Sequence, residues 1–516
     1  MPFPIDAIRR LRSSGRQLRT TAVVTMAALA LGAVAVYQPL LAIGLVVVAV
    51  AAFGVLARPD ATVLMVVFIV YTNAAVVAVK FHGLPSIVGI LVPLLLVVPL
   101  TYHLVIRRQT VIVTSALPLI GLFLVVQTLS ALFSSEPDVA LQGLTVYLVE
   151  GAGLYFVITN VVRTRAVLRQ VTWALLFAGI CMGGLSGYQQ ITKTFDKTYG
   201  GFAQANERGF GVETDRGRAE QRRLAGPIGE QNRYAQIMLM LVPLGLFRFW
   251  SEPSFWWRTL ALVATALAGL GAVLTFSRGG AVGFGLLLVL MAVMGYLRPR
   301  QLVVITVGLA VLLVAVPQFG FRMVSLQSLA GLAGNERVEV SGSFRGRATE
   351  MLAAVRVFAD YPILGVGPGR FKYYSAEYGN KIGLRVLDGT REAHSLYPAV
   401  AAENGVLGLV CFLGILFVTL RDLVRVRRSR LSSDPDAANT ATGFMLAVAA
   451  YMTTGLFLHF SYIRYFWLML ALAGSAAYVA DPASRIVQRK PGTPLPSVAG
   501  TRVPRSVAGT AAPAAG

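Results

Sequence analysis

Fourteen apolar runs, each about as long as a membrane-spanning helix, dominate this sequence of 516 residues. The hydrocarbon core of a bilayer is crossed by about 20 residues of α-helix, at roughly 1.5 Å rise per residue. The predicted spans are 20–36, 39–57, 61–80, 84–106, 111–133, 142–162, 167–188, 233–250, 256–275, 279–297, 301–317, 396–420, 440–458 and 462–480. The sequence therefore predicts an all-α integral membrane protein, a polytopic helical bundle of about 12–14 transmembrane helices.

The composition excludes an ordinary soluble enzyme. Hydrophobic residues make up 56% of the chain and charged residues 14%, with a mean hydropathy of +0.67. Soluble globular proteins carry about 25% charged residues. Both cysteines, Cys181 and Cys411, lie inside apolar runs, so we predict neither a disulfide framework nor a thiolate metal site.

The net charge of +22 would suggest nucleic acid as a partner in a soluble protein, but its distribution has another meaning here. With the N-terminus in the cytoplasm, the inside segments hold 25 Lys and Arg residues and the short outside loops hold 3. Cytoplasmic loops of membrane proteins are enriched in these residues. We therefore predict a multi-pass membrane protein with both termini cytoplasmic, and no nucleic-acid partner.

This orientation divides the chain into seven segments. They are a basic cytoplasmic segment (1–19), N-terminal helices (20–188), a first outer loop (189–232), central helices (233–317), a large second outer loop (318–395), C-terminal helices (396–480) and a disordered cytoplasmic tail (481–516). Loops longer than about 15 residues are usually functional or disordered. The apolar spacing from Glu350 to Ala359 predicts an amphipathic helix in the second loop, so we place the candidate site there, on the outer face.

Two residues at the outer face are the strongest candidates for chemistry. His394 ends the second outer loop, and an imidazole can take a proton near neutral pH. Arg278 lies in the shortest outer connection, and a guanidinium binds phosphate groups bidentately. Each also has a purely structural interpretation. His394 would then be a hydrogen-bonded histidine at the membrane interface, and Arg278 an arginine whose side chain extends to water.

Other arginines are weaker candidates for contact with an anion. They are Arg345 and Arg347 in the second outer loop, Arg370 after the glycine-rich turn 365–369, and Arg464 between the last two spans. A nucleotide-binding loop at this turn is not favoured, because the sequence predicts no βαβ unit around it.

Ionisable residues elsewhere indicate no metal site. His82, His103 and His459 form no ligand spacing with His394. Glu403 lies inside a predicted span, where we expect it to meet an arginine from another span.

Four motifs, in this order, resemble those of the O-antigen ligase and O-antigen polymerase family of bacterial envelope polysaccharide glycosyltransferases. They are Gly226-Pro-Ile-Gly-Glu-Gln-Asn232, Ser277-Arg278-Gly279, Arg347 leading a helix that ends in Asp360-Tyr-Pro-Ile-Leu-Gly-Val-Gly-Pro-Gly369, and His394-Ser395 followed nine residues later by Gly405-Val-Leu-Gly408. The resemblance covers roughly residues 224–410, and it adds Asn232 to the candidate substrate-binding residues.

The resemblance implies a glycan transfer at the outer face of the inner membrane that uses no metal and no cofactor. The donor would be a glycan on undecaprenyl pyrophosphate, and the acceptor a hydroxyl of a saccharide or of a lipid-linked molecule. His394 would take the proton of this hydroxyl, and Arg278 would hold the departing pyrophosphate. Envelope polysaccharide assembly proteins are possible partners, and we expect the stretch 373–391 to select the acceptor.

The sequence leaves three other functions open. A polysaccharide polymerase of the same family would differ from a ligase mainly in its acceptor. A membrane transporter would carry charges near the membrane midplane in interrupted spans, whereas these candidates lie at the outer face. A scaffold without catalysis is the third alternative.

Overall fold

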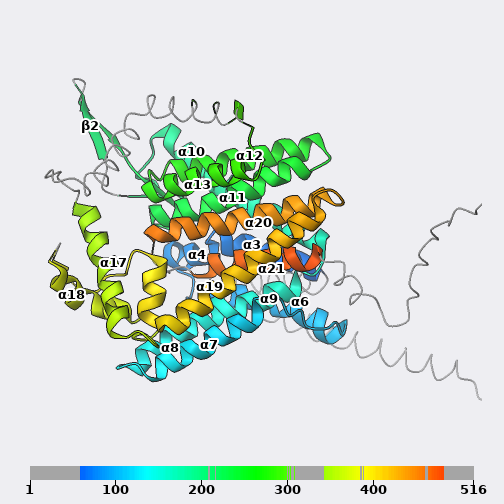
Figure 1. Cartoon of the computed structure of the whole chain (residues 1–516). Coiled ribbons are helices and arrows are strands. Elements are labelled where there is room, and N and C mark those ends of the chain that lie inside the picture. The colour runs from blue at the N-terminus through cyan, green and yellow to red at the C-terminus, as the bar shows by residue number, and fades with distance from the viewer. Residues whose placement is uncertain are drawn as a thin grey trace, which may run out of the picture.

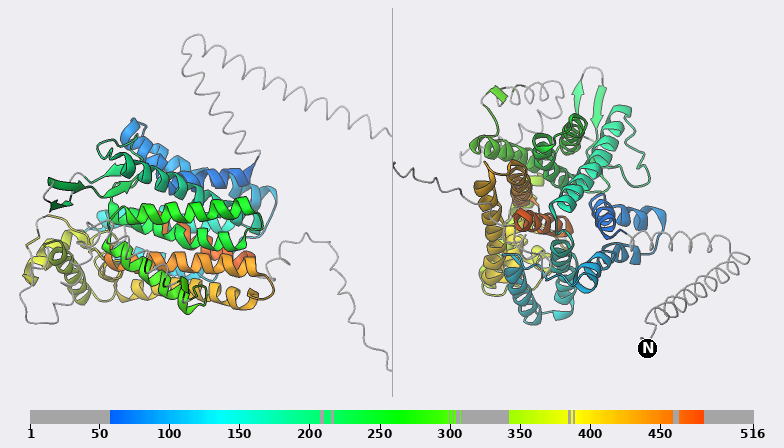
Figure 2. Two further views of the ribbon diagram at one scale, coloured as in Figure 1. Left: turned by 90° about the horizontal axis from the view of Figure 1, so that it is seen from above. Right: turned by 90° about the vertical axis from the view of Figure 1, so that its right-hand side faces the viewer.

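The computed structural model is a bundle of long helices whose axes are roughly aligned (Figure 1). It describes residues 58–206, 210–214, 217–298, 342–383, 386–387, 389–458 and 463–480, together with residues 300, 301, 303 and 307. The helices of the bundle are seen nearly end-on in the right-hand view of Figure 2. The helical membrane fold predicted from the sequence is confirmed.

Eight helical segments among the described residues are long and apolar enough to cross a membrane, and a bent pair of helices gives a ninth. The bent pair is α3 (Pro59–Tyr71) with α4 (Ala74–His82), and two shorter apolar helices are α7 (Leu117–Leu132) and α13 (Arg278–Val293). These segments coincide with eleven of the fourteen predicted spans. The spans 20–36 and 39–57, almost all of 301–317, and the segments 1–19 and 481–516 lie outside the described residues.

The remaining helical elements of the bundle include whole spans and spans that are broken into shorter pieces. The N-terminal elements are α5 (Ile87–Leu94), α6 (Val97–Thr101), η1 (Tyr102–Ile106), α8 (Pro137–Val146), η2 (Tyr147–Gly153), α9 (Leu154–Val161) and α10 (Arg165–Thr192). The C-terminal elements of the bundle are α11 (Gln231–Ser251), α12 (Phe255–Val273), α19 (Leu396–Arg430), α20 (Pro435–Thr454), η4 (Gly455–Phe457) and α21 (Ile463–Ala480).

The centre of the bundle is formed by α11, α20 and α21, whose side chains are mostly buried. Small residues let the backbones of membrane helices approach closely. Gly183 of α10 is an example, because a Cβ atom there would lie 2.2 Å from the carbonyl oxygen of Leu267 in α12. Trp467 of α21 packs edge-on against Tyr147 and Tyr155.

The parts outside the bundle gather at one of its ends (Figures 1 and 2). The first predicted outer loop forms two antiparallel strand pairs, β1 (Gln204–Ala205) with β4 (Leu224–Gly226) and β2 (Phe210–Thr214) with β3 (Gly217–Gln221). The second contains α17 (Gly342–Asp360) and α18 (Phe371–Ile382), so the helix expected around Glu350 is present. The two long loops therefore lie on the same side of the molecule.

Helix α19 is broken at Gly405, whose φ of 64° and ψ of −167° suit glycine alone. The turn between α17 and α18 packs into this break. The N–H groups of Val366 and Gly367 donate to the carbonyl oxygens of Ala402 and Glu403, at 2.9 and 3.0 Å. The break in α19 therefore holds the second outer loop against the bundle.

The prediction that Glu403 meets an arginine from another span was wrong. Its carboxylate accepts a hydrogen bond from the backbone N–H of Phe371 at 3.4 Å, and so helps to hold the same turn. The intramembrane glutamate that meets an arginine is instead Glu150, which lies 3.4 Å from Arg464.

Candidate active site

His394 lies at the junction between the second outer loop and α19. Its φ of 48° is in the left-handed region, which is uncommon for a residue other than glycine. The ring points to α17, where its Nε2 atom lies 3.4 Å from Oε2 of the buried Glu350. This contact joins two elements that are more than 40 residues apart in the sequence.

The surroundings of His394 favour the neutral imidazole. Burial lowers the pKa of His394 to about 4, and the positive charge of Arg347 adds to this effect. Arg233 and Arg391 act in the same direction, while the carboxylate of Glu230 opposes them. At neutral pH the ring is therefore unprotonated and available to accept a proton.

The charge of Arg347 acts on both His394 and Arg278. This residue lies on α17 three residues before Glu350, a spacing that places two side chains on one face of a helix. Two guanidinium groups that repel each other form a ready site for an anion, because a bound negative charge removes the repulsion.

Arg278 is positioned by a tight turn between α12 and α13. Ser277 caps α13 by accepting a hydrogen bond from the N–H of Gly280 at 3.3 Å. The carbonyl oxygen of Thr275 accepts a hydrogen bond from Nε of the buried Arg223 at 2.8 Å. The end of the first outer loop therefore holds the turn that carries Arg278.

Asn232 and Arg233 belong to the first turn of α11. The carboxylate of Glu230 caps this helix, accepting from the N–H groups of Asn232 and Arg233 at 3.0 and 2.6 Å. The side-chain oxygen of Asn232 accepts from Arg223 at 2.9 Å. Asn232 is thus linked through Arg223 to the turn of Arg278, and its neighbour Arg233 acts on His394.

The structure places two other predicted residues in separate interactions. Arg370 is buried, forms an ion pair with Glu136, and donates to Oγ of Ser135 at 2.8 Å. Arg464 donates to the side-chain oxygen of Asn73 at 2.6 Å, in addition to its contact with Glu150. These contacts give both guanidinium groups a bracing role within the protein. Arg345 belongs to α17, and its side chain is outside the described part of the structure.

Sequence reasoning missed four charged residues around His394, namely Glu230, Arg233, Glu350 and Arg391. Two of them left a signal in the sequence. Arg233 is a charge at the start of an apolar span, which is costly unless it has a partner or a function. Glu350 lies one helical turn after Arg347. No three His, Cys, Asp or Glu side chains among the described residues are grouped to hold a metal ion.

One comparison with known families covers the part of the sequence that holds Arg278, Arg347 and His394. Residues 263–413 match the family model described as O-antigen ligase. This match supports a relationship to the O-antigen ligase and polymerase family. The matched stretch runs from α12 into α19, and it includes Arg278, Arg347 and His394. No curated protein matches the chain.

Proposed function

We propose that this O-antigen ligase domain transfers a glycan from undecaprenyl pyrophosphate to a hydroxyl acceptor, on a saccharide or a lipid-linked molecule. The observation that carries the proposal is the neutral imidazole of His394 among the charges of Arg347, Arg233 and Arg391. A base and a cationic site for a leaving anion are the two groups that this transfer requires.

In the proposed step, the acceptor oxygen attacks the anomeric carbon of the donor sugar. The new glycosidic bond forms as the bond from this carbon to the pyrophosphate oxygen breaks, and the bonding electrons leave with the pyrophosphate. Nε2 of His394 takes the proton of the acceptor hydroxyl. Arg278 and Arg347 stabilise the negative charge that develops on the pyrophosphate.

The charges of the site also link the binding of the donor to the basicity of His394. The arginines that depress the pKa of His394 are the groups that a pyrophosphate would neutralise. Donor binding would therefore raise the pKa of His394 and make it a stronger base when the substrate is present. The carboxylate of Glu350, 3.4 Å from the ring, would then stabilise the imidazolium formed in the reaction.

The arrangement of the bundle supports a site on the outer face of the inner membrane. His394 lies just before the N-terminal end of α19, and Arg427, Arg428 and Arg430 lie at the other end of this helix. Arginine-rich ends of spans usually face the cytoplasm. With this orientation, both long loops and the His394 site face outwards, where lipid-linked glycans would be available.

The test is reconstitution of the purified chain in lipid vesicles with an undecaprenyl-pyrophosphate-linked glycan and candidate acceptors. His394→Asn is the most informative variant, because asparagine tolerates the left-handed backbone at this position and removes the base. We expect transfer to fall about 100-fold or more. Arg278→Lys keeps the charge but loses bidentate binding, so we expect a higher donor KM.

His82→Ala is the matched control, because this exposed histidine contacts the carbonyl oxygen of Gly200 outside the His394 cluster. Wild-type rates of glycan transfer by His394→Asn would contradict the proposal. Extension of the glycan on its lipid carrier, in place of transfer off it, would assign the chain as a polymerase. Movement of an intact substrate across the vesicle membrane without a new glycosidic bond would indicate a transporter.

A further inference from the structure

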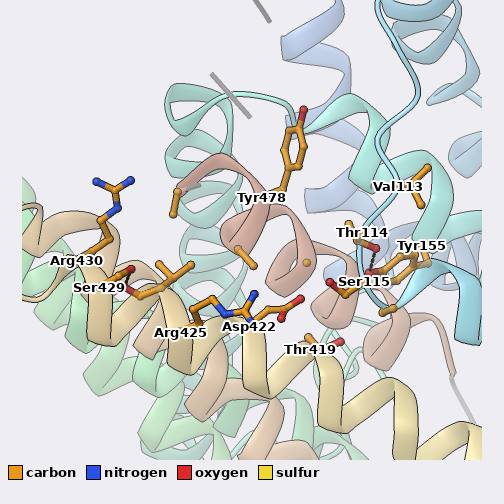
Figure 3. Close-up of a pocket in the computed structure, with 15 residues that line it drawn as sticks. Val113, Thr114, Ser115, Tyr155, Thr419, Asp422, Arg425, Ser429, Arg430 and Tyr478 are labelled. Carbon is orange, nitrogen blue, oxygen red and sulfur yellow. Dashed lines mark hydrogen bonds between the residues drawn. The ribbon is translucent and has the colours of Figure 1, made fainter. Parts of the chain in front are cut away.

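A second site lies at the end of the bundle away from His394. A cavity of about 320 Å³ opens between the segment before α7, the second half of α19 and the end of α21 (Figure 3). Its charged lining residues are Asp422, Arg425 and Arg430, and hydroxyl groups come from residues such as Ser115 and Tyr478. The proposed transfer reaction uses none of these residues.

The position of the cavity separates it from the candidate active site. The 21 residues from Gly405 to Arg425 span roughly 30 Å of helix, which is about the thickness of the hydrocarbon core. The cavity and His394 therefore lie near opposite surfaces of the membrane.

Three arginines at this end of the bundle are balanced by carboxylates from other segments. Arg165 pairs with Asp434, Arg169 with Glu252, and Arg248 with both Glu252 and Asp436. These pairs tie α10, α11 and α20 together, so their charges are already used within the protein.

Arg425 differs from these arginines. Asp422 accepts two hydrogen bonds from Arg421, at 3.0 and 2.8 Å, so the one acidic side chain of the cavity is already balanced. Arg425 forms no hydrogen bond or ion pair with any residue in the part of the chain that the structure describes. The cavity therefore has a net positive charge, which favours an anionic ligand.

An apolar surface continues from the cavity along α19. A second hollow beside it is lined by Phe417, Leu420 and Val424, and it shares Arg425 and Ser429 with the cavity. Val406, Val410, Leu413 and Phe417 are exposed at helical spacing, and so form one outward-facing stripe that leads to this hollow. A ligand here would find cationic and hydroxyl groups at one end and hydrocarbon along the helix.

We propose that the cavity binds the phosphate headgroup of an anionic phospholipid, whose acyl chains lie along the outward face of α19. Arg425 binds the phosphate, Arg430 lies at the edge of the cavity, and the hydroxyl groups meet the glycerol oxygens. A lipid fits better than free phosphate because the apolar stripe runs directly into the cationic hollow. Basic pockets between helices at the cytoplasmic surface are typical sites for anionic lipids.

The test uses the full chain, purified in detergent without phospholipid and titrated with phosphatidylglycerol. Native mass spectrometry measures bound lipid, and thermal unfolding measures stabilisation. We expect phosphatidylglycerol to bind, Arg425→Ala to weaken binding about fivefold, and phosphatidylcholine and inorganic phosphate to compete poorly. Ala477→Phe fills the cavity and keeps both arginines, so it should weaken binding even if Arg425→Ala folds badly.

Arg298→Ala is the control, because it removes an exposed arginine at the same end of the bundle but outside the cavity. It should leave lipid binding unchanged. Equal affinity in the wild type, Arg425→Ala and Ala477→Phe would overturn the proposal. Equal binding of phosphatidylcholine would overturn the requirement for an anionic headgroup, and equally strong competition by inorganic phosphate would overturn the assignment to a lipid.

Discussion

The imidazole of His394 and the carboxylate of Glu350 lie 3.4 Å apart, which connects the start of α19 to α17. Arg347 stands one turn before Glu350 on the same helix, and its charge acts on both His394 and Arg278. Helix α17 therefore presents an acid and a guanidinium side by side to the proposed base. This arrangement places α17 beside His394 in the candidate site, whereas the sequence alone predicted only an amphipathic helix in the same outer loop.

Glu350→Gln tests whether this carboxylate assists the reaction. We expect transfer to fall about 10- to 100-fold, because the imidazolium formed in the reaction loses a nearby negative charge. The acid limb of the pH profile should also move to lower pH, since the same loss makes His394 less basic. Rates measured in vesicles from about pH 5 to pH 9 would show both effects.

The control for this variant is Glu377→Gln, which removes an exposed carboxylate that pairs with Lys381 on α18. It should leave both the rate and the pH profile unchanged. Glu350→Asp should recover part of the rate. A pH profile of Glu350→Gln that coincides with that of the wild type would leave Glu350 with only a structural role.

Gly405→Ala tests the break in α19. A Cβ atom at Gly405 would lie 2.1 Å from the carbonyl oxygen of Ile363, so the docked turn of the second outer loop must move. We expect the protein to lose about 3 kcal/mol or more of stability, since this backbone conformation is nearly exclusive to glycine. Transfer activity should also fall, because the same turn positions α17.

Gly414→Ala on the same helix is the matched control. A Cβ atom there would lie 3.5 Å from Cδ1 of Leu119, an ordinary contact, so we expect no loss of stability. Thermal unfolding in detergent measures both variants. Equal unfolding temperatures for the two would mean that the break in α19 is not required.

Arg370→Ala tests whether Arg370 has a structural role or binds the donor. We expect it to lower stability by about 1–2 kcal/mol, because a buried guanidinium and its hydrogen bond to Ser135 are lost. The cost is limited because its partner Glu136 is largely exposed and can be solvated by water. Thermal unfolding should show this loss while the donor KM stays unchanged; a rise in donor KM at full stability would place Arg370 in the substrate site.

The pH dependence of stability tests the environment of His394. Its pKa is about 4 in the folded protein and close to 6.5 in the unfolded chain, so the unfolded chain binds more protons between these values. His394 should therefore contribute to stability above about pH 6.5, and this contribution should be lost as the pH falls towards 4. Chemical unfolding at several pH values should show a weaker dependence in His394→Asn, and equal slopes would contradict the low pKa.

The sequence by itself determined the membrane fold and the approximate position of the candidate site. Apolar runs long enough to cross a bilayer leave few alternatives to helices, because backbone groups inside a membrane must bond within their own segment. The motifs around Arg278, Arg347 and His394 stand out in the sequence because charged and glycine-rich stretches are rare between such runs.

Only the tertiary structure decided which charges act together. Arg370 and Arg464 resembled anion-binding residues in the sequence, but they meet Glu136 and Glu150 from distant segments. Glu350 became a neighbour of His394 because the break at Gly405 lets the second outer loop pack into α19. Hydropathy and local spacing report how far a residue lies from the membrane surface and which helix face it occupies. The partner of a charged side chain depends on contacts between segments that are far apart in the sequence.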